Sequence, residues 1–307
     1  MNDGHPFRVY LNDPISDSAL RRLRAHVELT DTFEQPETLD AIILRQQYCT
    51  REVIRRAKNC KLIQQHGVGL DRIDVQAAKE YGIPVKNTPG TNARSVAEYA
   101  IAMLLDLSRK VTAIHEKTRQ GKLPDFGMPE TVGLEMSGKT LGLVGSGHIA
   151  REVAQIARDG FRMTVACYNP HKSARQLAAM GFAPVADLRE LFRTCDYVSL
   201  HCLLTEDTYH MIGADVLAEC RPGLILVNTA RGGLIDEAAL YDALVSRRVA
   251  AAGLDVFERQ PPAVENPLLS LENFLAGMHV AGSTYEAMER TGKAVVDSVF
   301  DALGIEG

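Results

Sequence analysis

Short apolar runs alternate with amphipathic segments along almost the whole chain. In the N-terminal part, the runs predicted to be buried strands are residues 7–13, 40–45, 61–67 and 83–88. The segments between them repeat apolar positions every three or four residues, as amphipathic helices do; these are residues 16–26, 51–58 and 74–82. Strands that alternate with helices predict a parallel sheet with helices on both faces.

A second series of the same kind begins at residue 141. Its predicted strands are residues 141–145, 162–169, 196–202, 224–230 and 249–257. Its predicted helices are residues 148–160, 173–180, 187–195, 214–220 and 236–247. The pattern therefore predicts an α/β protein with two doubly wound parallel-sheet lobes.

A long helical pattern at residues 95–121 joins the two series. Ser95 and Glu98 have the spacing of a capping box at its start, and Gly121 is a suitable end. The Gly- and Pro-rich loop that follows, residues 122–138, is expected to be a hinge or an arm onto a partner subunit. The last helical pattern, residues 285–304, has no strand after it.

Composition narrows the class of protein. The 307 residues carry a net charge of −5 with a pI near 6.0, which gives no general affinity for nucleic acid or anionic membranes. No stretch reaches the roughly 18 apolar residues of a membrane span. Six scattered cysteines show no CxxC spacing, so we expect free thiols, no metal site and a cytoplasmic protein.

A glycine-rich turn follows the strand at residues 141–145. Gly145-Ser-Gly147-His-Ile-Ala150 has the GxGxxA form of a dinucleotide-binding turn between a strand and a helix. Gly145 permits the tight turn, and Gly147 lets the backbone approach a pyrophosphate at the helix N-terminus.

The next strand ends at Asn169, where NAD-binding proteins usually carry an acid for the adenosine ribose. Asparagine can accept a hydrogen bond from the ribose, but it lacks the charge that repels a 2′-phosphate. His171, Lys172 and Arg175 follow directly, and they either attract a 2′-phosphate or belong to a solvated loop. NAD is the expected cofactor, with NADP as the alternative.

Arg231 follows the strand at residues 224–230, at the edge of an α/β sheet where ligands bind. An arginine there can hold a carboxylate through two parallel hydrogen bonds, or it can pair with a surface acid.

Six segments spread over nearly the whole chain have the form of family motifs: HGVGLDRID (66–74), KNTPGTNARSVAE (86–98), the glycine turn, VNTARGGLID (227–236), AAGLDVF (251–257) and HVAGST (279–284). In these segments and in their order, the chain resembles the D-isomer-specific 2-hydroxyacid dehydrogenase family. The resemblance implies a Rossmann cofactor lobe, residues 98–284, inserted into a flavodoxin-like substrate lobe of residues 1–97 and 285–307. It also implies an active site in the cleft and a homodimer formed through the cofactor lobe.

The resemblance implies roles for individual residues. Arg231 would hold the substrate carboxylate and polarise the keto oxygen, and His279 would be the acid/base, a role that suits imidazole near neutral pH. The backbone of Val68 and Gly69 would meet the carboxylate. The expected cofactor contacts are Gly145, Gly147, His148, Ile149, Asn169, Cys202, Thr229, Ala230, Asp255, which would lie near the nicotinamide amide, and Gly282.

The segment VFERQPP (256–262) departs from the family. The family's glutamate partner of the catalytic histidine stands immediately before the first proline, where this chain has Gln260. Glu258 and Arg259 are expected to be solvated. A neutral amide stabilises imidazolium less than a carboxylate does, so we predict that His279 is protonated over a narrower, more acidic range than in Glu-bearing relatives.

Two further departures concern the cofactor cleft and the substrate. Leu203 and Glu206 stand where the family usually has prolines. Arg45 matches one phosphate-binding arginine of 3-phosphoglycerate dehydrogenases, but Gln65 stands where another would be, and a C-terminal regulatory domain is not expected. Arg45 is therefore either a ligand of a substrate's distal acid or a surface charge.

The function expected from these residues is hydride transfer between NAD(P) and a small 2-hydroxy or 2-oxo acid. Two alternatives remain open because of Gln260. One is a nucleotide-sensing protein like the corepressors related to this family, and the other is hydride transfer like that of formate dehydrogenases, which pair a glutamine with the histidine.

Overall fold

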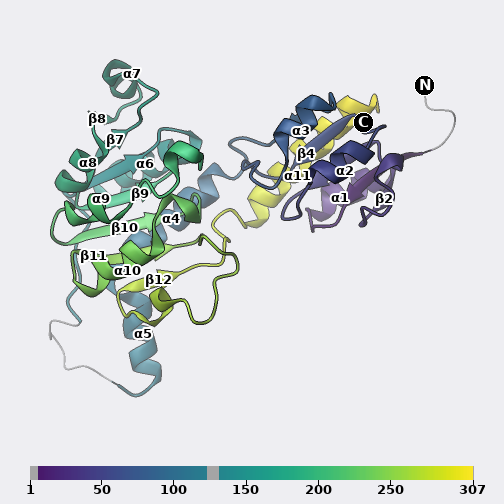
Figure 1. Ribbon diagram of the computed structural model, residues 1–307. Coiled ribbons are helices and arrows are strands. Elements are labelled where there is room, and N and C mark those ends of the chain that lie inside the picture. The colour runs from purple at the N-terminus through teal and green to yellow at the C-terminus, as the bar shows by residue number, and fades with distance from the viewer. Residues whose placement is uncertain (1–5, 123–130, 307) are drawn as a thin grey trace. The chain divides into compact units, whose positions relative to one another are not determined.

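The computed structural model describes residues 6–122 and 131–306, and the chain divides into two compact units (Figure 1). Unit 1 comprises residues 1–92 and 283–307, and unit 2 comprises residues 93–282. The expected boundary after residue 97 falls inside helix α4 (Ala93–Arg109), which belongs wholly to unit 2. The expected boundary after residue 284 lies two residues beyond the observed one.

Unit 1 contains a five-stranded, all-parallel sheet in the order β2-β1-β3-β4-β5, a flavodoxin-like arrangement. Its strands are β1 (Phe7–Leu11), β2 (Val27–Thr30), β3 (Ala41–Leu44), β4 (Leu62–Gln65) and β5 (Val85–Lys86). Its helices are α1 (Asp17–Arg24), α2 (Arg51–Arg56), α3 (Val75–Glu80), α11 (Tyr285–Leu303) and the 3₁₀ turn η1 (Pro36–Thr38).

Strand β3 shows how the sequence directs helices to both faces of this sheet. Ala41 and Ile43 pack into the core formed with α1 and α11, whereas Ile42 and Leu44 pack against α2 and α3. Successive side chains of a strand point to opposite faces, so this continuous apolar run is buried on both sides. The helix predicted at the C-terminus, α11, thus completes the sheet of the N-terminal residues.

Unit 2 contains a seven-stranded parallel sheet in the order β12-β11-β10-β9-β6-β7-β8, the Rossmann order with one added strand. Its strands are β6 (Thr140–Val144), β7 (Thr164–Tyr168), β8 (Ala183–Val185), β9 (Tyr197–Leu200), β10 (Leu224–Asn228), β11 (Val249–Leu254) and β12 (Phe274–Ala276). Its helices are α4, α5 (Val111–Arg119), α6 (His148–Phe161), α7 (Ala174–Ala179), α8 (Leu188–Thr194), α9 (Ala214–Ala218), α10 (Glu237–Val245) and the 3₁₀ turns η2 (Glu206–Thr208), η3 (Gly232–Leu234) and η4 (Pro267–Ser270).

Strand β10 is buried on both faces in the same way. Leu224 and Leu226 join the core formed with α8, α9 and α10, while Ile225 and Val227 join the core formed with α4 and α6. The strand order reverses between β6 and β9, and ligands of open α/β sheets bind outside the carboxyl ends of strands at such a point. The predicted fold class, two doubly wound parallel-sheet lobes, is confirmed.

Three strands were not predicted from the sequence, namely β2, β8 and β12. All three lie at sheet edges, and most of their residues are exposed or half-buried. An edge strand buries too few side chains to show the continuous apolar run of a central strand.

The predicted helix at residues 95–121 is two helices. Lys110 adopts a left-handed conformation (φ 58°) between α4 and α5, which ends the first helix. The predicted capping box is wrong, because α4 begins at Ala93 and Glu98 instead binds Arg94. Gly121 has the expected positive φ after α5. Of the expected hinge or arm, residues 123–130 lie outside the described residues.

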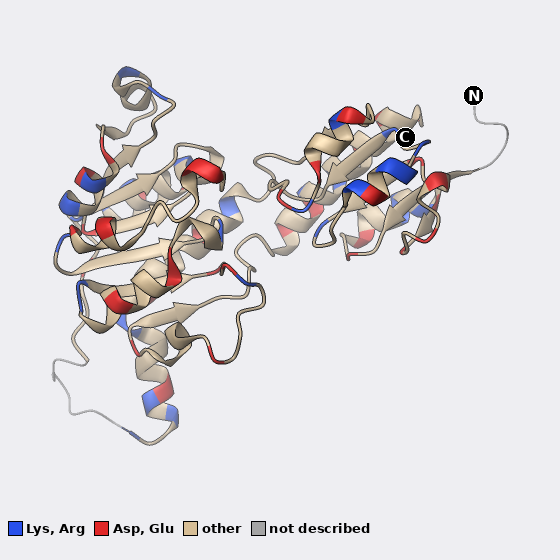
Figure 2. Cartoon of the chain, in the orientation of Figure 1, with Lys and Arg blue, Asp and Glu red and all other residues tan. Residues whose placement is uncertain are grey.

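Charged residues and cysteines are distributed over both units. Figure 2 shows acidic and basic residues interspersed along the helices of both units. All six cysteines are free, and the described residues contain no group of three or more His, Cys, Asp or Glu side chains arranged to hold a metal. Within the same residues, every helix is too short or too polar to cross a membrane.

Candidate active site

The glycine turn connects β6 to α6 as the motif requires. Gly145 has φ 102°, and a Cβ there would lie 2.6 Å from the carbonyl oxygen of His201, so only glycine fits. Gly147 caps α6 without any side-chain hydrogen bond to the first-turn amides. A Cβ on Gly147 would meet no atom within 4 Å, so its backbone is open to a neighbouring group. These features fit the pyrophosphate of a dinucleotide.

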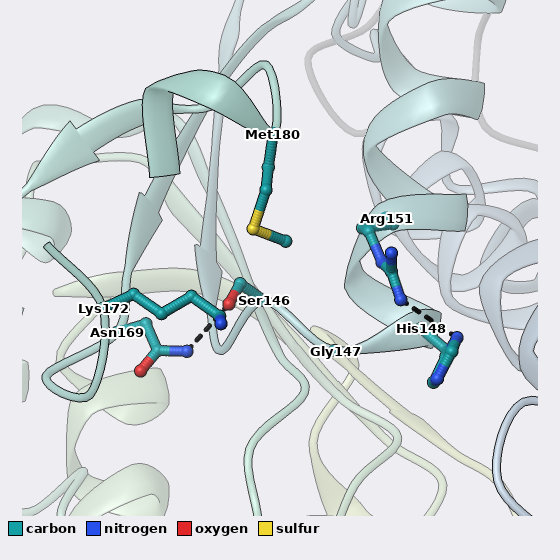
Figure 3. Close-up of a pocket in the computed structure, with 7 residues that line it drawn as sticks. All are labelled: Ser146, Gly147, His148, Arg151, Asn169, Lys172 and Met180. Carbon is teal, nitrogen blue, oxygen red and sulfur yellow. Dashed lines mark hydrogen bonds between the residues drawn. The ribbon is translucent and has the colours of Figure 1, made fainter. Parts of the chain in front are cut away.

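A pocket of about 460 Å³ opens beside this turn (Figure 3). Its lining residues are Ser146, Gly147, His148, Arg151, Asn169, Lys172 and Met180. Three of these carry basic side chains and none carries a carboxylate. The pocket is therefore electropositive, on the side of the turn where the second strand ends.

Asn169, immediately after β7, is held by bonds at both ends of its amide. Its Nδ2 donates to Ser146 Oγ at 2.8 Å (Figure 3), and its Oδ1 accepts the His171 backbone N–H at 2.9 Å. The oxygen expected to meet the ribose thus already has a donor. Of the three basic residues considered for a 2′-phosphate, only Lys172 lines the pocket; His171 and Arg175 do not.

Arg231 lies three residues beyond the last residue of β10, after the buried Thr229 and the half-buried Ala230. Asn228 shapes this turn, because its Oδ1 accepts the Ala230 N–H at 2.9 Å and its Nδ2 donates to the Arg231 carbonyl at 2.8 Å. The Arg231 guanidinium donates to the Ala230 carbonyl at 2.7 Å. The asparagine's role was not foreseen, although its place at the strand end is the signal that would have indicated it.

Gly232 brings the Arg231 turn against the segment after β11. A Cβ on Gly232 would lie 2.0 Å from the Phe257 carbonyl carbon, so the two backbones are in direct contact only because this residue is glycine. This packing fixes the turn that carries Arg231 relative to the segment that carries Gln260.

His279 and Gln260 come together as the sequence suggested. His279 Nδ1 lies 2.9 Å from Gln260 Oε1, and a bond to that oxygen requires the proton on Nδ1. Nε2 is then the nitrogen that can accept or give a proton. His279 has φ 56°, and its backbone N–H donates to the Asp255 carbonyl at 2.6 Å.

The Asp255 carboxylate binds the backbone of the loop that carries His279. It accepts the N–H groups of Val280 at 3.1 Å and Ala281 at 2.8 Å, and the Tyr99 hydroxyl also bonds to it. Burial raises the pKa of Asp255, while the bonds from the loop oppose that rise. Burial, and then the nearby Asp255 charge, raise the pKa of Tyr99. Tyr99, on α4, was not foreseen, because its partner lies 156 positions away in the chain.

Glu258 is exposed, as expected, but its side chain also makes contacts that the sequence did not suggest. Its Oε2 lies 3.1 Å from His210 Nε2, an ion-pair contact without hydrogen-bond geometry, and accepts the Tyr209 hydroxyl at 3.4 Å. Its backbone N–H donates to Glu237 Oε1 at 2.7 Å. Glu258 thus holds the start of α10 and the segment after β9, while Arg259 is exposed, as expected.

The remaining expected cofactor residues lie at the carboxyl ends of the same sheet or in α6. Cys202 follows β9 and is half-buried, and burial raises the pKa of its thiol to about 11. Leu203 and Glu206, which replace prolines, are both exposed, and Glu206 begins η2. His148 is exposed at the start of α6, Ile149 packs against the core, and Gly282 ends the His279 loop.

Unit 1 holds the expected substrate residues. Asn87 Nδ2 donates to the Val68 carbonyl at 2.7 Å, which fixes the loop of Val68 and Gly69 after β4. The Arg45 guanidinium donates to the Pro14 carbonyl at 3.1 Å and to Ser283 Oγ at 3.4 Å.

His66, next to that loop, is buried, and it was not foreseen as a special residue. Burial first, and then the nearby Arg45 charge, lower the pKa of its imidazole to about 4. His66 is therefore neutral near pH 7.

Comparisons with known proteins agree with this geometry. Residues 101–281 match the family model described as "D-isomer specific 2-hydroxyacid dehydrogenase, NAD binding domain". A hydroxypyruvate reductase of Thermotoga maritima is 42% identical, over 97% of this chain and 99% of its own length. A D-3-phosphoglycerate dehydrogenase of Archaeoglobus fulgidus is 36% identical over 95% of this chain, which spans only 56% of that protein. A solved acyclic imino acid reductase in complex with NADPH and D-Arg has a TM-score of 0.87, 27% identity and 97% coverage of both chains.

Proposed function

Because the chain belongs to the D-isomer-specific 2-hydroxyacid dehydrogenase family, and is an NAD(P)-dependent oxidoreductase of 2-hydroxy and 2-oxo acids, we propose that it reduces a small 2-oxo acid of the size of hydroxypyruvate. The observation that carries this proposal is the arrangement of His279, Gln260 and Arg231 on segments that follow the neighbouring strands β10, β11 and β12. The 42% identity to a hydroxypyruvate reductase over both whole lengths supports the choice of substrate.

His279 is the acid in this proposal. Its Nε2 gives a proton to the keto oxygen of the substrate, and Gln260 keeps the ring in the tautomer and orientation that this transfer needs. Arg231 binds the substrate carboxylate through its guanidinium. When bound, the nicotinamide supplies the hydride to the keto carbon, so that the 2-oxo acid becomes a 2-hydroxy acid. In the oxidative direction His279 accepts the hydroxyl proton.

The groups on unit 1 fit a substrate without a phosphate. We assign carboxylate binding to the backbone of Val68 and Gly69. Arg45 already donates to a carbonyl and a hydroxyl, and Gln65, whose Nε2 donates to the Arg45 carbonyl at 3.1 Å, brings no second positive charge. A phosphate monoester, with three acceptor oxygens and nearly two negative charges, would need more cationic donors than this.

The cofactor is assigned to the carboxyl edge of the unit 2 sheet. Gly145, Gly147, His148 and Ile149 would hold the pyrophosphate at the start of α6. Asn169 would lie beside the adenosine ribose. The residues assigned to the rest of the cofactor, including the nicotinamide, are Cys202, Thr229, Ala230, Asp255 and Gly282.

The test is the loss of reduced-nicotinamide absorbance with a panel of 2-oxo acids and with NADH and NADPH in parallel. The panel holds glyoxylate, pyruvate, hydroxypyruvate, its 3-phosphate and a dicarboxylic oxo acid. Turnover that is greatest with hydroxypyruvate supports the proposal. Preference for the 3-phosphate would overturn the choice of substrate. Tight binding of reduced cofactor without turnover of any acid would favour a nucleotide sensor, and formate oxidation would then be assayed.

We also infer a homodimer formed through unit 2. Helix α5 has no buried residue, and Val111, Val132 and Leu134 are exposed apolar side chains in α5 and in the segment that follows it. An unpartnered apolar surface of this kind is typical of a subunit interface. Light scattering should give twice the mass of one chain, and Val111→Glu should shift the protein toward the monomer. The six free thiols support a reducing, cytoplasmic location.

A further inference from the structure

The electropositive pocket beside the glycine turn lacks one feature of a site that is selective for NAD. A protein selective for NAD places a carboxylate at the end of the second strand, where it accepts bonds from the ribose hydroxyls and repels a 2′-phosphate. Here that position is Asn169, and no carboxylate lines the pocket. The pocket therefore has no group that excludes a second anion.

The Asn169 side chain also makes its hydrogen bonds within the protein. Asn169 Oδ1 accepts the His171 N–H, and its Nδ2 donates to Ser146 Oγ, so the amide acts as a brace between two loops. A carboxylate can accept a bond from each ribose hydroxyl on a separate oxygen, whereas the Asn169 amide has a single acceptor oxygen, which already accepts the His171 N–H. The position therefore contributes an uncharged side chain to the lining of the pocket.

Two cations face each other across the pocket. Figure 3 shows Lys172 extending along Asn169 toward Ser146, with Arg151 and His148 on the opposite side, at the start of α6. Arg151 Nη2 lies 3.0 Å from His148 Nδ1, which holds the guanidinium at the pocket. Among the residues that the structure describes, no carboxylate lies within 4.0 Å of the Lys172 ammonium or the Arg151 guanidinium. Both charges are available to an anion.

We propose that this pocket binds the 2′-phosphate of NADP, with Lys172 and Arg151 as the residues that select it, so that the enzyme prefers NADPH to NADH. The inference rests on the proposed placement of the dinucleotide on the glycine turn. A phosphate monoester carries nearly two negative charges at neutral pH, and a Lys and an Arg on opposite sides supply the charge-assisted donors that it needs. Ser146 and Asn169 also line the pocket, beside Lys172.

The experiment measures binding without turnover. Calorimetry with adenosine 2′,5′-bisphosphate and with 5′-AMP isolates the 2′-phosphate, because the two nucleotides differ in nothing else. The bisphosphate should bind at least tenfold more tightly. Lys172→Ala and Arg151→Ala should each weaken it by about tenfold and leave 5′-AMP within about twofold. Asn169→Asp should abolish the preference. The matched control is Arg175→Ala, which removes a nearby charge outside the pocket and should change neither affinity.

Several outcomes would count against the proposal. Equal affinity for the two nucleotides would overturn it, as would an unchanged preference in both alanine variants. If inorganic phosphate binds as tightly as the bisphosphate, the pocket is an anion site that does not recognise the adenosine part of the nucleotide. Turnover with NADH alone would refute this inference and leave the proposed function standing. Tight bisphosphate binding without reduction of any oxo acid would support this inference and refute the proposed function.

Discussion

His279 Nδ1 bonds to Gln260 Oε1 at 2.9 Å, so the partner of the proposed acid/base is a neutral amide and not a carboxylate. The geometry of a Glu–His pair is preserved while its charge is absent. Gln260 can therefore orient the imidazole but adds little to the stability of imidazolium. The consequence concerns the pH range of reduction, which needs protonated His279.

Gln260→Glu should extend the reductive reaction toward alkaline pH. A carboxylate 3 Å from the ring stabilises imidazolium, so the alkaline limb of kcat/KM for reduction should move up by about one pH unit. Oxidation needs the neutral ring and should lose rate at neutral pH. The measurement is the pH profile in both directions, with Arg259→Gln as the control at the exposed neighbouring position. An unshifted alkaline limb in the Glu variant would show that the pair does not set the protonation of the acid.

Tyr99→Phe should slow catalysis with little effect on the affinity for substrate. The Tyr99 hydroxyl bonds to the Asp255 carboxylate, which in turn holds the amides of Val280 and Ala281 in the His279 loop. Loss of one bond should let the loop move, and kcat should fall about tenfold while KM changes less than threefold. Thermal unfolding should show a loss of only about 1 kcal/mol.

Tyr285→Phe supplies the matched control for that variant, since its side chain is 92% exposed. It should leave kcat, KM and the melting temperature unchanged. A Tyr99 variant that lost stability but kept kcat would show that Tyr99 stabilises the fold and does not position the His279 loop.

Gly147→Ala should separate folding from cofactor binding. The residue has φ −72°, and a Cβ there meets no atom within 4 Å, so alanine should not destabilise the chain. If the pyrophosphate approaches this backbone, the added methyl group should weaken NADPH binding by tenfold or more. Cofactor fluorescence measures the affinity for NADPH, and thermal unfolding measures the stability of the variant. Gly160→Ala, exposed in α6 and also without a neighbour within 4 Å, should alter neither binding nor catalysis and should raise the unfolding free energy slightly.

The sequence predicts those parts of the fold that repeat a simple pattern. Central strands such as β3 and β10 are continuous apolar runs, so both lobes and their parallel sheets could be inferred. Strand β8 has no such signal, because two of its three residues are exposed. The break at Lys110 could not be inferred either, since lysine is a good helix former and its left-handed conformation is imposed by the surrounding structure.

In the candidate site, too, local features could be predicted from the sequence and contacts between distant segments could not. The glycine turn and the Arg231 turn are shaped by residues close together in the chain, so their motifs were sufficient to predict where these turns lie. The contacts of Glu258 with His210 and of Asp255 with Tyr99 join segments from different strands and helices. No local pattern in one sequence encodes such pairs, and only the packing of α4 and of the segments after β9 and β11 reveals them.

His66 should make the protein less stable in acid. Burial and the Arg45 charge lower the pKa of this histidine from 6.5 to about 4, so its neutral form is favoured in the folded state. A lowered folded pKa gives stability that is present above the unfolded value and lost as the pH falls. The loss should run from about pH 6.5 to about pH 4 and reach on the order of 3 kcal/mol. Urea unfolding at a series of pH values measures it.

His66→Gln removes the titrating group and keeps a polar side chain of similar size. Its unfolding free energy should fall less steeply between pH 6.5 and pH 4 than that of the wild type, even though the substitution costs some stability at pH 7. The control is His115→Gln, which changes an exposed histidine of α5 and should leave the slope unchanged. Equal slopes for the wild type and the His66 variant would mean that the imidazole accepts its proton in the folded state without penalty, which its burial beside the Arg45 cation argues against.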